Sequence, residues 1–102
     1  QDFIFACQQN GVTPILLTGI PYGSLATAQD NERKWLNAEV AKMAAAGHCL
    51  LADINAAIGD GATPERIKSA YDNGDGIHPN EAAIEGVFVP IIKTAIQQAL
   101  MY

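Results

Sequence analysis

The residues of this chain best suited to chemistry lie together in one short segment, Asp75-Gly76-Ile77-His78-Pro79-Asn80. A carboxylate and an imidazole three residues apart can serve acyl transfer, because the imidazole accepts a proton from a nucleophile while the carboxylate orients the ring and stabilises the resulting cation. Gly76 loosens the backbone before the histidine, and Pro79 restricts the conformation of His78. The segment therefore predicts a constrained loop that carries a general base.

An Asp and a His at this spacing also occur together by chance, as solvated loop residues or as part of a helix cap. The residues that follow favour a functional interpretation. Asn80 is a good N-cap residue, and the charge of Glu81 suits the first turn of a helix. His78 is therefore expected just ahead of a helix N-terminus, on a loop over a rigid scaffold, where functional residues often lie.

The chain offers no obvious nucleophile for this base. Its two serines are Ser24 and Ser69, and neither lies in a sequence context typical of a catalytic serine. A nucleophilic serine needs a positioned base and donors for the oxyanion. Both serines are therefore predicted to be ordinary loop or helix residues.

The same run from Asp75 to Asn80 resembles the last sequence block of the SGNH hydrolases, also called GDSL esterases and lipases. In that family the block supplies the Asp and the His of a Ser-His-Asp triad, so the resemblance assigns these roles to Asp75 and His78. The order of the elements over essentially the whole chain is also similar to the C-terminal part of the family's domain. The family's serine lies in an upstream Gly-Asp-Ser block, which this sequence lacks, and its oxyanion-hole residues also lie upstream.

The resemblance implies an α/β fold, a three-layer sandwich with a parallel sheet that is flavodoxin-like in the SGNH manner, with residues 1–102 as the C-terminal portion of a single domain. It implies a serine esterase without a cofactor, acting on a small ester, with a small acyl group on a carbohydrate slightly favoured. The nucleophile would come from a missing N-terminal part or from another chain. The alternative is a non-catalytic α/β module that binds carbohydrate or a protein partner. A metal hydrolase using His48, Asp53 and His78 has no ligand spacing to support it.

Composition narrows the classes of partner. A chain of 102 residues is at most one small domain. Its net charge of −5, from 6 basic and 11 acidic residues, argues against nucleic-acid binding, and no apolar run is long enough to cross a membrane. Cys7 and Cys49 are predicted to be free buried thiols rather than a disulfide.

The elements expected around the loop alternate between helix and strand. Helices are predicted over 2–10, with Gly11 as the C-terminal stop, and over 31–46, and apolar runs predict buried parallel strands over 15–20 and 49–54. Strand, helix, strand implies a right-handed crossover. Two parallel strands make a poor sheet with an unpaired edge, so the chain is expected to need its missing half, a second copy or another partner.

Several side chains have two possible roles. Asp53, at the end of the second strand, is expected to cap a short helix that begins near Asn55, with a place in the active site as the alternative. Tyr22 is expected to pack in its loop rather than line a substrate cleft. Trp35 is expected at the core or its rim rather than as a platform for a sugar ring.

Three more predictions concern the helices. Leu36, Val40 and Met43 should form the inward face of the helix over 31–46. A short helix should begin at Thr63-Pro64. The closing helix after Asn80 should bear a continuous apolar stripe, with a kink at 87–90 caused by the proline there.

Overall fold

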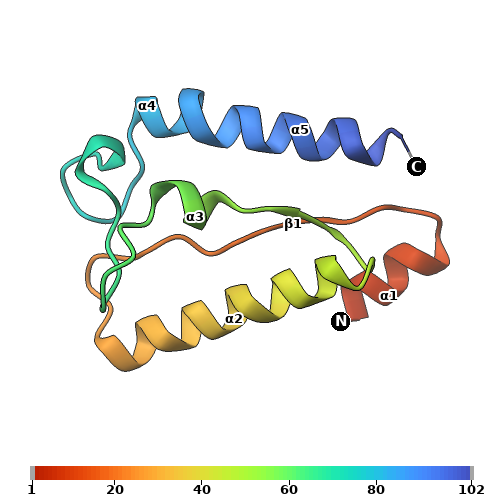
Figure 1. The fold of residues 1–102 in the computed structure, drawn as a ribbon, viewed down its shortest axis with the longest axis horizontal. Helices are drawn as coiled ribbons and strands as arrows, with labels where there is room; N and C mark the ends of the chain where they lie inside the picture. Colours follow the sequence, from red (N-terminus) through yellow and green to blue (C-terminus); the bar gives the residue numbers. More distant parts are fainter. Residues whose placement is uncertain (1, 102) are drawn as a thin grey trace.

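The computed structural model describes residues 2–101, in which a small sheet lies between helices (Figure 1). The elements, in chain order, are α1 (Asp2–Gln9), β1 (Ile15–Leu17), α2 (Thr27–Ala45), β2 (Leu50–Ala52), α3 (Ile54–Ile58), the 3-10 turn η1 (Ser69–Tyr71), α4 (Glu81–Ala83), the π-turn η2 (Ile84–Phe88) and α5 (Val89–Ala99). The predicted alternation of helix and strand is confirmed, although both strands are shorter than expected.

The sheet joins two segments that lie 35 residues apart in the chain. β1 and β2 run parallel, with Ile15 opposite Leu50 and Leu17 opposite Ala52. In Figure 1 the closing helix lies along one side of the strands and α2 along the other, so the predicted three-layer arrangement is confirmed. Within residues 2–101 each strand pairs with only the other, which leaves an unpaired edge on both.

Helix α2 begins four residues earlier than predicted and buries a different face. Its N-cap is Ala26, whose amide donates to the side chain of Gln29. The predicted inward face is wrong in part, since Val40 and Met43 are half-buried but Leu36 is 56% exposed. Trp35 is 63% exposed and is therefore not a core residue. Polar side chains in the first half of the helix point inward instead, because they bind other segments through the buried cluster described below.

The helix predicted at Thr63-Pro64 does not form. The chain bends at these two residues, and Ile67 then makes an antiparallel bridge with Gly59. The buried Glu65 carboxylate accepts hydrogen bonds from the Arg33 side chain and from the Gly61 amide. These long-range contacts outweigh the local capping signal, since propensity is a weak prior that tertiary context overrides.

The closing helix runs without a break from α4 through η2 to α5. Its predicted irregularity takes the form of the π-turn, in which the Val89 amide donates to the Ile84 carbonyl five residues back. Pro90 has no amide hydrogen, and its ring would clash with the carbonyl four residues earlier, so a shifted ladder is a common solution. The predicted stripe is buried only in part, because Val87 and Ala95 are buried while Ile84, Ile96 and Leu100 are exposed.

The best-packed part of the molecule lies between α3 and the start of the closing helix. Its buried residues are Ile54, Ile58, Ala83 and Val87. Half-buried side chains pack around them, namely Ile20, Ala57, Tyr71, Phe88, Ile91 and Ile92. Since Tyr71 precedes the Asp/His segment and Ala83 follows it, this cluster anchors both ends of that segment.

Helix α1 and the cysteines complete the description. In α1 the buried side chain is Ile4, whereas Phe3 is exposed. Cys7 and Cys49 are free thiols, as predicted, but only Cys49 is buried, whereas Cys7 is half-buried. Burial raises the pKa of Cys49. None of the helices within residues 2–101 is both long enough and apolar enough to cross a bilayer.

Candidate active site

Asp75 and His78 form a close hydrogen-bonded pair. The Nδ1 atom of His78 lies 2.6 Å from Oδ2 of Asp75. The other carboxylate oxygen, Oδ1, accepts the backbone amides of Ile77 and His78, each at 2.9 Å. One carboxylate therefore holds both the backbone of the turn and the imidazole ring, which is the arrangement that the sequence predicts for a general base and its orienting acid.

The ionisation of Asp75 decides which ring nitrogen is free. The hydrogen bond with the His78 ring, reinforced by the two backbone amides, holds the pKa of Asp75 well below its ordinary value. A carboxylate only accepts hydrogen bonds, so Nδ1 must carry the proton that is shared with Asp75. In the neutral imidazole Nε2 is then the proton acceptor. The side chain of His78 is 70% exposed, so the ring remains accessible to a reactant.

A second aspartate shapes the loop that carries the pair. Oδ1 of Asp72 accepts the amide of Gly74 at 2.9 Å and that of Gly76 at 3.0 Å. Both glycines have positive φ angles, +109° and +74°, which residues with a side chain rarely adopt. The loop closes through an antiparallel bridge between Asp72 and Pro79. Asp72 was not predicted to shape this loop, although an Asp ahead of glycines is a common signal for such a turn.

Asn80 joins the loop to the closing helix. Its Oδ1 accepts the Ala83 amide at 2.9 Å, which confirms Asn80 as the N-cap of α4. Its Nδ2 donates to the carbonyls of Ala70 and Asp72, in the segment that leads into the loop. The predicted position of His78, just ahead of a helix N-terminus, is therefore confirmed.

The loop that follows β1 packs directly on the Asp/His loop. The Gly23 amide donates to the Gly76 carbonyl at 2.8 Å. Neighbouring Tyr22 is 44% exposed, so it is not packed as closely as predicted. The structure thus brings the end of β1 to the candidate site, as expected for a site at the carboxyl ends of parallel strands.

The other residues considered from the sequence take structural places. Asp53 caps α3 through the Ala56 amide and accepts a hydrogen bond from the Thr18 hydroxyl, which confirms the capping prediction. Ser24 and Ser69 are exposed, and neither hydroxyl is hydrogen-bonded to His78 in the described part of the chain. His48 is exposed and bonds Gln8, and no three potential metal ligands come together within residues 2–101.

A second cluster of charges lies buried between α2 and the segment around Glu65. Arg33 uses all five of its N–H groups: Nε and one Nη2 hydrogen bind Asp30, the other Nη2 hydrogen binds Glu65, and Nη1 binds the Asn55 side chain and the Gly19 carbonyl. Asp30 has no exposed side-chain surface. Sequence reasoning missed this cluster, because nothing near Glu65 in the chain indicates a partner 32 residues away.

Hydrogen bonds set the protonation of this cluster. Burial raises the pKa of Asp30, but the Glu65 amide, Arg33 and Lys34 outweigh burial and leave the pKa below its ordinary value. The same balance of burial against Arg33, Asn55 and Gly61 lowers the pKa of Glu65. No side-chain nitrogen or oxygen buried within residues 2–101 lacks a partner. The cluster is saturated, so it is suited to holding the fold rather than to moving a proton.

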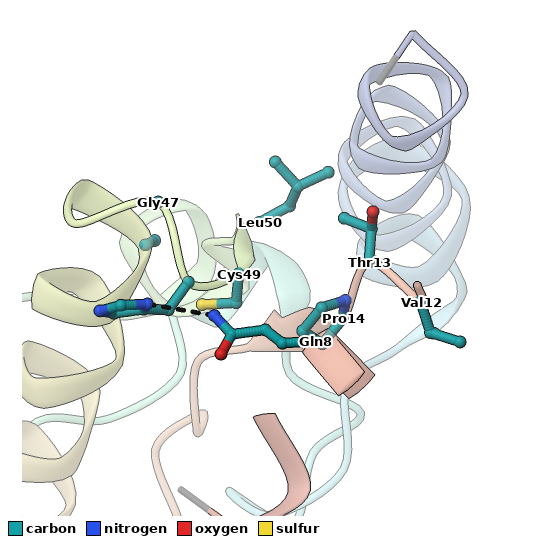
Figure 2. A pocket seen from close by; sticks show the side chains of 9 residues that line it. Gln8, Val12, Thr13, Pro14, Gly47, Cys49 and Leu50 are labelled. Carbon is teal, nitrogen blue, oxygen red and sulfur yellow. Dashed lines mark hydrogen bonds between the residues drawn. The ribbon is translucent and has the colours of Figure 1, made fainter. Parts of the chain in front are cut away.

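A cavity of about 340 Å³ opens at the other end of the strands (Figure 2). It lies between the end of α1, the residues that lead into β1 and the start of β2, and Figure 2 shows Gln8 and Cys49 next to each other in its wall. The Gln8 side chain is 3.2 Å from Nδ1 of His48. Neither Asp75 nor His78 lines this cavity, so it is separate from the candidate active site.

The fold defined above is an α/β fold of the SGNH or GDSL hydrolase type, as comparison with solved structures shows. The structure is similar to a GDSL-like lipase from Bacteroides thetaiotaomicron, with a TM-score of 0.80 over 96% of this chain and 19% sequence identity. It is also similar to a protein from Bacteroides fragilis assigned as an acylhydrolase, with a TM-score of 0.69 over 96% of this chain and 20% identity. No protein-family model and no curated protein matches the chain.

The extent of these matches is itself informative. The chain spans only 49% and 46% of the two solved structures. This partial coverage fits the C-terminal portion of such a domain, as the resemblance of the last sequence block implies. The predicted resemblance and fold class are therefore confirmed, while the roles of Asp75 and His78 stay predictions.

Proposed function

We propose that this chain supplies the general base and its orienting acid to a serine ester hydrolase of the SGNH type. The observation that carries the proposal is the 2.6 Å contact between Asp75 and Nδ1 of His78, with the rest of the ring open to solvent. The likeness of the fold to a GDSL-like lipase supports the same class of reaction. The serine, the oxyanion donors and the substrate pocket would lie outside these 102 residues.

Each residue has a defined part in the proposed reaction. Nε2 of His78 accepts the proton of the serine hydroxyl as the serine oxygen bonds to the ester carbonyl carbon. The imidazolium then gives this proton to the departing alcohol oxygen, and the C–O bond breaks to leave an acyl-enzyme. Asp75 keeps Nδ1 protonated and stabilises the imidazolium without itself taking the proton. Water repeats both steps to release the acid.

We also propose that the missing catalytic groups arrive with a further stretch of polypeptide that completes the domain. Each described strand has an unpaired edge, and a two-stranded sheet is marginal in water. Large apolar side chains are exposed on both helical layers and on β1, namely Phe3, Phe5, Leu17, Trp35, Leu36, Ile84, Val89 and Ile96. An added strand and its helices would cover such residues, and the solved structures are about twice as long as the matched region.

The experiment is hydrolysis of p-nitrophenyl acetate, a small ester, by the full polypeptide that carries this chain. His78→Ala should lower kcat by about 10⁴-fold, because the serine loses its base. His48→Ala is the matched control, since His48 is also exposed but lies at the far end of the strands, and it should retain full activity. Equal activity of the two variants would contradict the assignment of His78. Absence of hydrolysis in the unaltered protein would favour a non-catalytic binding module instead.

A further inference from the structure

The peptide units on either side of Gly76 are held from two directions. The Gly76 amide donates to Oδ1 of Asp72 at 3.0 Å, within the same loop. The Gly76 carbonyl accepts the Gly23 amide at 2.8 Å, from the loop that follows β1. Gly76 is flanked by Asp75 and lies two residues before His78, so this clamp acts next to the proposed base.

The approach of the two backbones depends on Gly23 having no side chain. A Cβ atom placed on Gly23 would lie 2.6 Å from the Gly76 carbonyl oxygen and 3.1 Å from its carbonyl carbon. These are backbone atoms, so no side-chain rotation could relieve the contact. The φ angle of Gly23 is not positive, and alanine could therefore adopt the same backbone conformation. Space alone, and not backbone strain, explains why glycine is needed.

The clamp fixes the position of the Asp/His loop relative to the loop that follows β1, which contacts within the Asp/His loop cannot do. The contacts of Asp75 with the His78 ring and amide lie within one turn, so they persist wherever the loop sits. The position of that turn relative to the loop after β1 depends on contacts between segments. The hydrogen bond from Gly23 joins the two loops at Gly76, two residues before His78. In acyl transfer a base displaced by about 1 Å can lose about 10²-fold in rate.

We propose that Gly23 is a positioning residue, which acts through Gly76 to place Nε2 of His78 against a serine that lies outside these residues. Asp72 has the complementary part, because it fixes the other side of Gly76 from within the loop. This inference rests on the proposed function for its catalytic consequence. Its structural content, the docking of residues 72–80 on Gly23, can be tested independently.

The variants separate the clamp from a general loss of stability. Gly23→Ala should lower kcat by about 10²-fold with little change in KM, because placement of the base, not binding of the ester, is disturbed. Gly86→Ala is the matched control, since its added Cβ would have no atom within 4 Å and its φ is also not positive. Asp72→Ala should also lower kcat, whereas Asp72→Asn should retain most activity because its side-chain oxygen still accepts both amides.

The experiment measures p-nitrophenyl acetate kinetics and amide hydrogen exchange on the full polypeptide for all four variants. The proposal expects faster exchange over residues 72–80 and lower kcat in Gly23→Ala, with Gly86→Ala unchanged in both. Unchanged exchange and kcat in Gly23→Ala would overturn it, as would an Asp72→Asn variant no better than Asp72→Ala. If the unaltered protein hydrolyses no ester, the proposed function fails, and exchange over 72–80 alone then supports or overturns the docking role.

Discussion

Two groups in this chain each pair an aspartate with a nitrogen-bearing side chain, but one group is exposed to solvent and the other is buried. Asp75 and His78 lie on an outer loop, with side chains that are 44% and 70% exposed. Asp30 and Arg33 lie in the first turns of α2 and face the segment around Glu65, where their exposed fractions are 0% and 11%. Both groups lie next to the segments that follow β1, since Arg33 binds the Gly19 carbonyl and the Asp/His loop binds Gly23.

The contrast shows that close pairing of charges does not by itself mark a catalytic site. In the buried cluster every donor of Arg33 is occupied, and a proton or a reactant has nowhere to bind. In the loop the pairing with Asp75 occupies only one side of the imidazole and leaves Nε2 free. A free, oriented lone pair with access to solvent distinguishes the proposed catalytic pair from the structural one.

The comparison predicts that the two groups fail in different ways, and the largest effect should be on catalysis. Asp75→Asn should lower kcat of the full protein by about 10⁴-fold, because the amide no longer holds the ring in the productive tautomer. Its thermal midpoint should change little, since the side-chain oxygen of asparagine can still accept the amides of Ile77 and His78. Steady-state kinetics and a melting curve of the same sample measure both. Normal turnover in Asp75→Asn would remove this residue from the triad.

The next effect should be on stability. Arg33→Met should lower the free energy of unfolding by about 3 kcal/mol or more, because it leaves the buried Glu65 carboxylate without a cation and the buried Asp30 carboxylate with only Lys34. Lys42→Ala is the control, since Lys42 pairs with Glu39 at the surface, where such a pair contributes less than about 1 kcal/mol. Urea unfolding of both variants tests this. Equal midpoints would mean that the buried cluster contributes no more than a surface pair.

The smallest expected effect is in the acid dependence of stability. Asp30 and Glu65 have pKa values below the ordinary 3.8 and 4.5, so the unfolded chain binds more protons than the folded one at acidic pH. Their stabilising contribution is complete above the unfolded values and is lost as pH falls through the folded ones. Urea midpoints should therefore be flat from about pH 7 to 5 and fall below about pH 4.5. Glu65→Gln should be less stable near neutrality and lose less stability in acid.

The local parts of the fold could be predicted from the sequence. The apolar runs around Leu16 and Leu51 indicated the two parallel strands, although the predicted burial is wrong for β1, in which Leu17 is 45% exposed. Gly11 and Asn80 marked helix ends that the structure confirms. The face of α2 and the segment around Thr63 could not be predicted, because both depend on Arg33 meeting Glu65 across 32 residues. Apolar periodicity assumes that an inward face is apolar, and here part of it is ionic.

The candidate site follows the same rule: its local pairing could be predicted from the sequence, and its long-range contact could not. The spacing of Asp75 and His78 indicated their pairing, because both lie within one turn that glycines make possible. Gly23 could not be connected with them, since its contact with Gly76 joins segments 53 residues apart and leaves no mark in the local sequence. The only trace in the sequence is the glycine itself, and its close contact with the other loop is seen only in the folded structure.

The most direct test of the account is labelling of the full polypeptide with a fluorophosphonate, which traps activated serines, followed by intact-mass measurement. The account predicts a single adduct on a polypeptide heavier than the 10.8 kDa of these residues, and its near absence in His78→Ala. Labelling of His78→Ala at the unaltered rate, or an adduct on Ser24 or Ser69, would contradict the claim that the exposed Asp75–His78 pair activates a serine outside this chain.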